Sequence, residues 1–338
     1  MRSSSFFNLI PRFHKTSELG RGRILLYHRI IDISSDPSLL AVSPRRFCEH
    51  LRLLRETCEP LSLSELLSRG GENIPRNAIA LTFDDGYQDN FTKAFPLLKR
   101  FDIPATIFVT SGYIGKAQEF WWDEVERCIL DPALLPDCIT LQLGGISLHH
   151  TLVEDSTRET YQGTNDPEAG DPSPCTRRQL FDEILQCMMG LDREERDRCL
   201  ESIRQWVGIS PGYRKENRPL SEEELITLAD DPLIEIGSHS VNHTVLSLQE
   251  PLRQEEELRK SRTDLEALTG RPVRFFAYPY GAPRDFSALT IKKVRQAGYL
   301  AACANSPGFV RPNMDRCKLP RFLVRDWDTH VFSRNFQL

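Results

Sequence analysis

The chain has 338 residues, of which 40% are hydrophobic, and its formal net charge is −5. This length is enough to bury a sizeable core in one large domain, or in one and a half. The acidic balance, with no basic stripe, excludes nucleic acid as the expected partner. No stretch approaches the roughly 18 uninterrupted apolar residues of a spanning helix, so we expect no transmembrane segment.

The first 20 residues predict a flexible leader. Their apolar cluster around Phe6 and Phe7 is broken by Asn8 and Pro11, and it is too short for the apolar region of a signal peptide. Peripheral membrane contact through Phe6 and Phe7 is the alternative. The nine cysteines show no CxxC spacing, which indicates reduced thiols. We therefore expect a cytoplasmic protein, or one held at the inner membrane face, and the sequence indicates no oligomeric state.

Seven short apolar runs have the composition of strands that are buried on both faces. They are Ile24 to Tyr27, Ala78 to Phe83, Ala105 to Val109, Ile234 to Ile236, Val273 to Ala277, Leu300 to Ala304 and Phe322 to Val324.

Helical patterns lie between these runs. Ser221 and Glu224 have the spacing of a capping box, and Gly270 and Gly298 stand where helix C-caps are expected. Strands that alternate with helices predict an α/β fold with a parallel sheet, either open or closed into a barrel. The expected helices are Pro44 to Arg55, Asp89 to Arg100, one that Ser221 opens, Pro251 to Thr269, and Ser287 to Ala297.

The middle of the chain breaks this alternation. We interpret residues 127–218 as an insertion between two parts of one domain, residues 21–126 and 219–328, with residues 329–338 as a polar tail. Ile139 to Val153 reads as a hairpin around Gly144-Gly145, Gln162 to Pro174 as a mobile loop, and Arg177 to Val207 as helical. The insertion could form a lid or a substrate-selecting subdomain.

Two adjacent carboxylates, Asp84 and Asp85, follow the second apolar run directly and precede Gly86. The carboxyl ends of parallel strands are where α/β folds build active sites. A turn at Gly86 would let both carboxylates face one cleft, where a metal ion on one leaves the other free as a base. The alternative is that Asp84 or Asp85 caps the helix over Asp89 to Arg100.

His239 and His243 follow the fourth apolar run and stand four residues apart. Imidazole nitrogens suit zinc, iron, cobalt or nickel. With one aspartate they would make a set of two histidines and one carboxylate, which leaves open positions for water and substrate.

Two further segments carry candidate site residues. Tyr280 lies between Pro279 and Gly281 at the end of an apolar run, where an irregular backbone could aim an N–H at a developing oxyanion. Trp121 and Trp122 could stack on a sugar ring, although core or rim packing is the alternative.

Together these segments resemble the polysaccharide deacetylase family, the NodB-homology group of carbohydrate esterase family 4. The family's motifs Thr-Phe-Asp-Asp-Gly, His-Ser/Thr-x-x-His and Pro-Tyr-Gly are present as residues 82–86, 239–243 and 279–281. The resemblance covers about residues 20 to 328. It implies a distorted (β/α) barrel of about seven strands, interrupted here by a largely helical insertion.

The same resemblance assigns roles to individual residues. Asp85, His239 and His243 would bind a divalent metal, expected to be Zn²⁺, with Co²⁺, Ni²⁺ or Fe²⁺ as alternatives. Asp84 would be the base that takes a proton from water, and the backbone N–H of Tyr280 would help to stabilise the oxyanion. We expect the substrate to contact four residues: Trp121, Trp122, Pro279 and Tyr280.

Two departures from the family pattern matter. The arginine that orients the base is replaced by Ala277, and we expect Arg321 to substitute for it. The usual C-terminal His-Asp strand is missing, since His330 lies in the polar tail, but the segment that ends at His28 looks like that strand moved to the front. This arrangement resembles a circularly permuted branch found among bacterial exopolysaccharide deacetylases, and it implies that His28 is the general acid. A structural histidine is the alternative for His28.

We therefore expect a hydrolase that removes acetyl groups from an N-acetylated amino sugar in a bacterial polysaccharide, an exopolysaccharide or a lipid-linked glycan precursor. Three alternatives remain open at this point: a non-catalytic glycan-binding protein on the same fold, a hydrolase of small non-peptide amides, and a non-haem iron oxygenase. Asp84 argues against the oxygenase, because a free base beside the metal ligands serves water activation.

Overall fold

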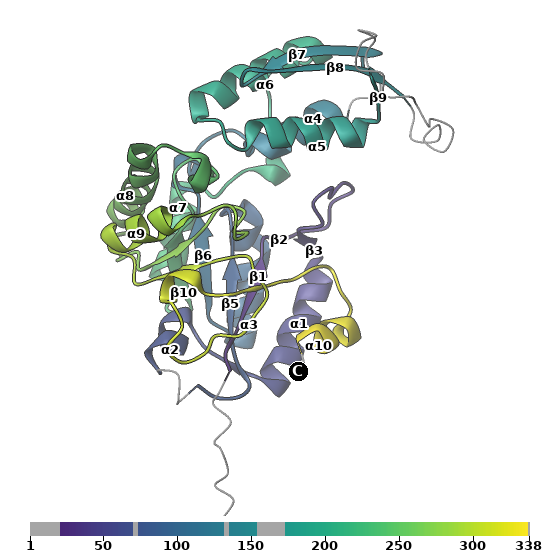
Figure 1. Cartoon of the computed structure of the whole chain (residues 1–338). Coiled ribbons are helices and arrows are strands. Elements are labelled where there is room, and N and C mark those ends of the chain that lie inside the picture. Colours follow the sequence, from purple (N-terminus) through teal and green to yellow (C-terminus); the bar gives the residue numbers. More distant parts are fainter. Residues whose placement is uncertain (1–20, 70–73, 132–134, 154–172, 337–338) are drawn as a thin grey trace, which may run out of the picture.

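The computed structural model describes residues 21–69, 74–131, 135–153 and 173–336 (Figure 1). The expected leader at residues 1–20 and nearly all of the expected loop from Gln162 to Pro174 lie outside these residues. Among the described residues, no helix combines the length and the apolar character needed to cross a bilayer.

A curved sheet of parallel strands forms the centre of the molecule, as the seven apolar runs predict. Seven strands lie in the order β12-β11-β10-β6-β5-β1-β13, and β4 adds to the side of β5. All seven of these strands match predicted runs to within two residues at either end. Their bounds are β1 Arg23–Tyr27, β4 Glu59–Pro60, β5 Ala78–Phe83, β6 Ala105–Val109, β10 Ile234–Ser238, β11 Phe275–Ala277, β12 Ala301–Cys303 and β13 Phe322–Leu323.

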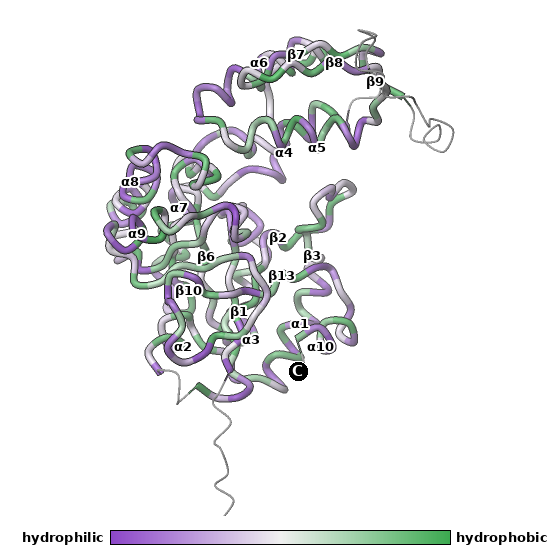
Figure 2. Tube along the Cα trace, viewed as in Figure 1, coloured by the Kyte–Doolittle hydropathy of each residue, from purple (hydrophilic) through white to green (hydrophobic). Residues whose placement is uncertain are grey.

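The register of the strands sets the position of the residues that follow them. Tyr27 at the end of β1 pairs with Phe83 at the end of β5, and Val109 of β6 pairs with Ser238 of β10. The residues that follow these four strands therefore lie together at the carboxyl end of the sheet. Figure 2 shows the strands as the hydrophobic interior and α8 as largely hydrophilic.

The two outer strands of this sheet, β12 and β13, do not pair directly, so the sheet is a half-barrel. The segment that leads into β13 narrows the gap, because Leu319 exchanges backbone hydrogen bonds with Ala302 and Ala304 at 2.9 and 2.8 Å. The α/β barrel of about seven strands is thus confirmed as a curled, incompletely closed sheet.

Helices cover the outside of the half-barrel. The capping box of Ser221 and Glu224 is present, and Gly270 ends α8 in the left-handed conformation with a φ of 65°. The expected single helix over Asp89 to Arg100 instead begins with a π-helical turn. The bounds are α1 Pro44–Thr57, α2 Leu63–Ser68, the π-helix Asn90–Ala94, α3 Phe95–Phe101, α7 Glu222–Asp230, α8 Pro251–Thr269 and α9 Ala288–Gln296.

The insertion forms a layer above one end of the barrel (Figure 1). The predicted hairpin is confirmed as β7 and β8, which pair antiparallel across Gly144-Gly145. Its hydrophobic cluster includes Phe120 and Trp121, which precede residue 127, and also Tyr87 and Tyr113 from the segments that follow β5 and β6. Its elements are α4 Trp121–Ile129, β7 Cys138–Leu143, β8 Ile146–Leu152, β9 Ser173–Cys175, α5 Arg177–Met188 and α6 Arg193–Val207.

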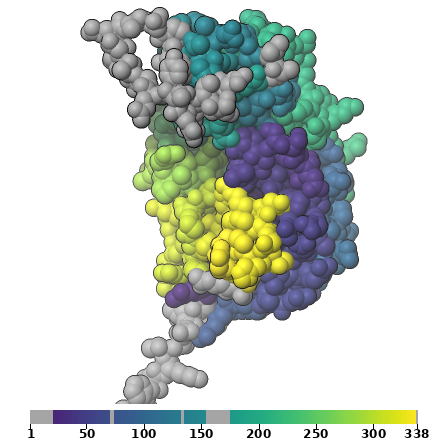
Figure 3. All heavy atoms as spheres, turned by 90° about the vertical axis from the view of Figure 1, so that its right-hand side faces the viewer, coloured from purple at the N-terminus to yellow at the C-terminus, as the bar shows by residue number. Residues whose placement is uncertain are grey.

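The C-terminal segment differs from the predicted polar tail. Residues Thr329–Phe336 form helix α10, because Phe332 and Phe336 are buried against the barrel and offset the cost of ordering the chain. The ring of Phe332 stacks on His50 of α1 at 3.9 Å. Figure 3 shows the C-terminal residues, in yellow, next to the purple residues that follow residue 20.

The remaining elements are short. The strands β2 Arg29–Ile30 and β3 Ala41–Val42 pair in parallel and flank residues 31–40, which we call the rim loop. Four 3₁₀ turns complete the described elements: Ser111–Tyr113, Lys215–Asn217, Leu246–Leu248 and Arg316–Lys318.

Candidate active site

Tight turns at the strand ends aim the predicted side chains into one place. Asp85 and Tyr280 each stand at the centre of a three-residue turn with a positive φ, 73° and 61°, closed by hydrogen bonds from Gly86 to Asp84 at 2.9 Å and from Gly281 to Pro279 at 2.7 Å. Positive φ is costly for residues other than glycine, and such strain concentrates at functional sites.

The predicted ligand set comes together. One carboxylate oxygen of Asp85 lies 3.5 Å from Nε2 of His239 and 3.3 Å from Nε2 of His243, and all three side chains are buried. Ligand atoms bound tetrahedrally about 2.0–2.1 Å from a zinc ion would be about 3.4 Å apart. The spacing of the three atoms therefore fits one divalent ion of zinc's size.

The surroundings of His239 favour the same reading. Its Nδ1 donates to the carbonyl of Ala277 at 2.8 Å, which leaves the unprotonated Nε2 facing Asp85. An outer hydrogen bond of this kind fixes the tautomer that binds a metal. Burial lowers the pKa of His239, and burial followed by the charge of Arg196 lowers the pKa of His243 to about 3, so both rings are neutral at pH 7.

Asp84 differs from Asp85, because both oxygens of its carboxylate accept hydrogen bonds from Arg321. The guanidinium donates to both oxygens of Asp84 at 2.6 and 2.7 Å, and also to Thr82 and to the carbonyl of Ala304. Burial alone would raise the pKa of Asp84, but the adjacent Arg321 charge outweighs it and lowers the pKa to about 2. Asp84 is therefore ionised at neutral pH, and it lies 3.8 Å from Nε2 of His239.

Arg321 is the residue that we expected to replace the arginine missing at Ala277. It contacts Asp84 and does not line the cleft, so we propose that it positions Asp84. The helix-capping alternative for Asp84 and Asp85 is wrong, because the following helical turn begins at Asp89 without a side-chain cap.

The site lies at the bottom of a cleft with a volume of about 320 Å³. His28, Asp84, Asp85, His239 and His243 all line it. One wall is formed by the rim loop. The insertion adds three apolar side chains of α5 and the turn after it to the lining: Phe181, Leu185 and Met189.

Among the remaining predicted residues, Trp122 and Tyr280 lie beside the predicted metal ligand His243. Their rings lie 4.5 and 4.8 Å from the His243 ring, and the hydroxyl of Tyr280 is buried without a hydrogen-bond partner. Trp121 also lines the cleft but is mostly part of the core of the insertion. Pro279 is buried outside the cleft lining, and its carbonyl accepts the turn's hydrogen bond.

His28 lines the cleft, as a general acid must. Its Nδ1 is buried and has no hydrogen-bond partner, while its carbonyl accepts from Asn90 at 2.8 Å. Burial lowers the pKa of His28, and the charges of Asp85 and Asp84 act in the opposite direction.

Two buried residues that the sequence did not single out hold the loop of the histidines. Glu257 of α8 accepts from the backbone N–H groups of Val241 and Asn242, both at 2.9 Å. Arg196 of α6 donates to the carbonyl of Asn242 at 2.7 Å and to that of His243 at 3.4 Å. Neither lies in a recognisable motif, so no local signal could have identified them.

Arg196 links the insertion to the barrel. Besides its bonds to the histidine loop, it donates to the carbonyls of Met188 and Met189 at 3.0 Å each, and its guanidinium lies 4.9 Å from the Trp121 ring. Its side chain is almost fully buried. A helix of the insertion thereby fixes the backbone beside a predicted metal ligand.

Asp123 also lines the cleft and is buried, and the sequence did not single it out. Its carboxyl accepts from the hydroxyl of Tyr87 at 2.8 Å, which in turn accepts from Trp122 at 2.7 Å. Burial raises the pKa of Asp123 to about 8, although the charge of Arg29 and the Tyr87 hydrogen bond oppose the shift. At neutral pH the carboxyl of Asp84 is therefore ionised, whereas that of Asp123 is largely protonated.

Comparison with known proteins identifies the fold and its motifs. A family model for polysaccharide deacetylase matches residues 71–133 and 202–302, and the gap between these segments falls within the insertion. Strands β1 and β13 lie outside the match and pair with each other, as a permuted arrangement requires.

Curated relatives match over shorter stretches. The poly-β-1,6-N-acetyl-D-glucosamine N-deacetylase of Escherichia coli (strain K12) is 37% identical over 82 residues, which are 23% of this chain and 12% of that protein. A putative polysaccharide deacetylase of Bacillus subtilis (strain 168), YxkH, is 33% identical over 105 residues, 30% of this chain and 36% of that protein. The chain thus spans well under half the length of these relatives.

A solved structure extends the likeness to the whole fold. IcaB from Ammonifex degensii superposes with a TM-score of 0.54 at 18% sequence identity, and the alignment covers 90% of this chain and 92% of that one. At this identity the superposition shows a common fold. The family match covers just under half of the chain, in two segments that contain the Asp84-Asp85 and His239–His243 motifs, so the chain carries a polysaccharide deacetylase domain that is split in two.

Proposed function

We propose that this chain is a metal-dependent N-deacetylase of an N-acetylated amino sugar, carried in a bacterial polysaccharide, an exopolysaccharide or a lipid-linked glycan precursor. The observation that carries the proposal is the buried set of Asp85, His239 and His243 beside an ionised Asp84 at the bottom of a cleft. A cytoplasmic location, expected from the reduced cysteines, belongs to the same proposal.

Zn²⁺ is the expected ion, with Co²⁺, Ni²⁺ or Fe²⁺ as alternatives, held by Asp85, His239 and His243. When bound, such an ion would polarise an amide carbonyl and would lower the pKa of bound water to about 7.

Asp84 accepts the proton of the attacking water. Arg321 keeps it ionised and oriented, and an ionised carboxylate has about four acceptor positions, so two remain open after the bonds to Arg321. The backbone N–H of Tyr280 stabilises negative charge on the acetamide oxygen. His28, which also lines the cleft, gives a proton to the departing amine.

The sugar occupies the space between the aromatic residues and the rim loop. Trp122 and Tyr280 offer flat faces beside the metal ligands, which suits the apolar face of a sugar ring. The apolar side chains that the insertion adds to the cleft lining exclude water from the acetamide, and this strengthens the electrostatic interactions in the cleft.

The experiment that tests the proposal is acetate release from a panel of N-acetylated glycans, lipid-linked sugars and small amides, each run with added Zn²⁺ and with a chelator. We expect chelator-sensitive release from at least one sugar. Release from small amides alone would favour an amide hydrolase. Glycan binding without release by the metal-loaded protein would favour a non-catalytic binding protein, and dependence on a 2-oxo acid would indicate an oxygenase.

The role of His28 has a separate test. The His28→Ala variant should lower kcat by roughly 10²-fold, the low end of the contribution of general acid–base catalysis, while the protein keeps its metal. The exposed His330→Ala serves as the control. Unchanged turnover with an intact metal content would mean that the general acid is another group.

A further inference from the structure

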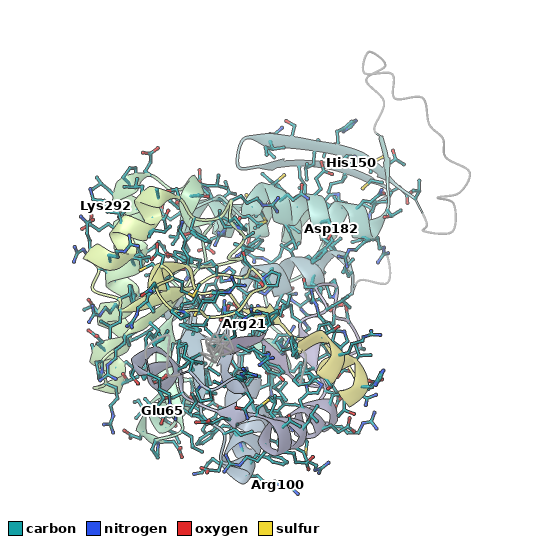
Figure 4. The ribbon with its side chains drawn as sticks, turned by 60° about the horizontal axis from the view of Figure 1, so that its bottom comes forward. Arg21, Glu65, Arg100, His150, Asp182 and Lys292 are labelled. Atoms are coloured by element: carbon teal, nitrogen blue, oxygen red, sulfur yellow. The ribbon has the colours of Figure 1, made fainter. Side chains whose placement is uncertain are left out.

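A second cluster of metal-ligating side chains lies in the insertion, away from the cleft floor. His150 of β8, Cys175 of β9 and Glu183 of α5 each present a ligand atom, and the three atoms all lie within 4.8 Å of one another. Figure 4 shows His150 on the hairpin, above the helix that carries Asp182 and hence its neighbour Glu183. The cluster therefore joins the sheet of the insertion to the helix beneath it.

The side chains of His150 and Glu183 are in direct contact within this cluster. Nε2 of His150 lies 2.8 Å from a carboxylate oxygen of Glu183, yet neither ring nitrogen of His150 makes a hydrogen bond. The oxygen is thus close to the ring nitrogen but outside the direction of its N–H. Two ligands of one tetrahedral ion would lie about 3.4 Å apart, so binding of an ion would move these two atoms slightly apart.

A cysteine nucleophile with its base is the competing explanation for such a trio. In that arrangement the thiol would bond to the imidazole. Here the Cys175 thiol donates to the carbonyl of Thr176 at 3.3 Å, and the side chain is 5% exposed. The sulfur is therefore neither hydrogen-bonded to His150 nor open to a substrate.

We propose that His150, Cys175 and Glu183 bind a divalent transition-metal ion of the zinc class, with water as the fourth ligand. Sulfur, imidazole nitrogen and carboxylate oxygen are the three donor types that zinc takes in proteins. As thiolate, neutral imidazole and carboxylate they carry two negative charges, which a divalent cation balances, and the thiol proton is released on binding.

The position of the site gives it a structural task. Glu183 lies on α5 between Phe181 and Leu185, two residues that line the cleft. An ion bound at Glu183 therefore ties this wall of the cleft to strands β8 and β9. The site is independent of the proposed deacetylase activity, and its test does not depend on any substrate.

Cobalt titration of the metal-free full-length protein tests the site directly. The cleft set contains no sulfur, so a thiolate-to-Co²⁺ charge-transfer band can come only from a cysteine site. We expect two Co²⁺ ions per chain in the wild type and an intense near-ultraviolet band. Cys175→Ser should remove the band and one ion, whereas His239→Ala should remove the other ion and leave the band.

Two matched controls make the assignment specific. His149, the neighbour of His150, lies 3.0 Å from Thr140 on the exposed face of the hairpin, so His149→Ala should keep the band and His150→Ala should weaken it. Cys187 lies one turn from Glu183 on α5, and Cys187→Ser should also keep the band. A wild type that binds one Co²⁺ without a thiolate band, or a band that survives Cys175→Ser, would overturn the proposal.

Stability supplies a measurement that does not depend on the variants of the cluster. In the His239→Ala background only the insertion site remains, and Zn²⁺ at about 100 times its dissociation constant should stabilise the fold by about 2.7 kcal/mol. No rise in the melting temperature with added Zn²⁺ in that background would also overturn the proposal.

Discussion

In the barrel, the reactive side chains follow the ends of parallel strands, whereas in the insertion the residues that reach the cleft come from the sides of helices. Asp84 and His239 each emerge at a strand end, where the chain must turn. Arg196 and Phe181 lie on α6 and α5, and only packing of these helices over the barrel brings them to the site.

The two regions also differ in the partners of their buried arginines. The barrel pairs a buried carboxylate with a buried guanidinium, Asp84 with Arg321. The buried Arg196 of the insertion bonds instead to four backbone carbonyls. The contact with Arg321 sets the ionisation of Asp84, whereas the contacts of Arg196 fix the backbone beside His243. We therefore expect substitutions in the barrel to reduce catalysis strongly, and substitutions in the insertion to have smaller effects, on metal binding.

The largest expected effect comes from removing a metal ligand of the barrel. His239→Ala should lose the cleft metal and all measurable acetate release, because a set of two ligands no longer encloses the ion. Metal content after dialysis and acetate release measure the two effects. The exposed His330→Ala is the control, and a His239→Ala protein that keeps both metal and activity would show that the ion binds elsewhere.

Removing the base should separate chemistry from metal binding. Asp84→Asn should keep the cleft metal and lower kcat by roughly 10²-fold or more, since a general base contributes about 10²–10⁴-fold. The exposed Asp264→Asn is the matched control. Full activity in Asp84→Asn would rule out the proposed role, and loss of metal would make Asp84 a ligand.

The insertion should matter through Arg196. Arg196→Met has a similar length but cannot hold the carbonyls of Asn242 and His243, so we expect metal affinity to fall by about 10–100-fold, the usual effect of losing an outer partner of a metal ligand. Competition with a chelator measures the affinity without any substrate. Arg198→Met, on the exposed side of the same helix, should change nothing. Equal affinity in both variants would mean that the insertion does not hold the histidine loop.

The smallest effect is a change in the pH dependence of stability. The folded pKa of Asp123 is about 8 and its ordinary value is 3.8, so between these values the folded protein holds a proton that the unfolded chain releases. The free energy of unfolding should therefore fall as pH rises, by at most about 1.4 kcal/mol per pH unit from this group. Asp123→Asn should remove this contribution.

Urea unfolding at pH 5, 6, 7 and 8 measures the effect, with Asp131→Asn, a surface position, as the control. We expect the Asp123→Asn protein to gain stability relative to the wild type as pH rises. Parallel curves for the two proteins would mean that Asp123 is ionised in the folded state at pH 5.

The sequence by itself determined the order of the strands and helices along the chain and the residues at the bottom of the cleft. Short apolar runs that alternate with helical patterns predict buried strands, and the motifs at their ends are local, so Asp84, Asp85, His239, His243 and Tyr280 were all identifiable in advance. The hairpin and the capped helices were predictable for the same reason, because turns and caps depend on neighbouring residues.

The tertiary structure decided which distant residues complete the site. The sequence suggested Arg321 as a replacement for the arginine missing at Ala277, but only the structure shows its contact with Asp84, 237 positions away, and the contact of Arg196 with the histidine loop. Helix α10 formed where a polar tail was expected, because its two phenylalanines find a buried place only once the barrel exists. Such contacts depend on packing between elements, and packing leaves no local pattern in the residues that make it.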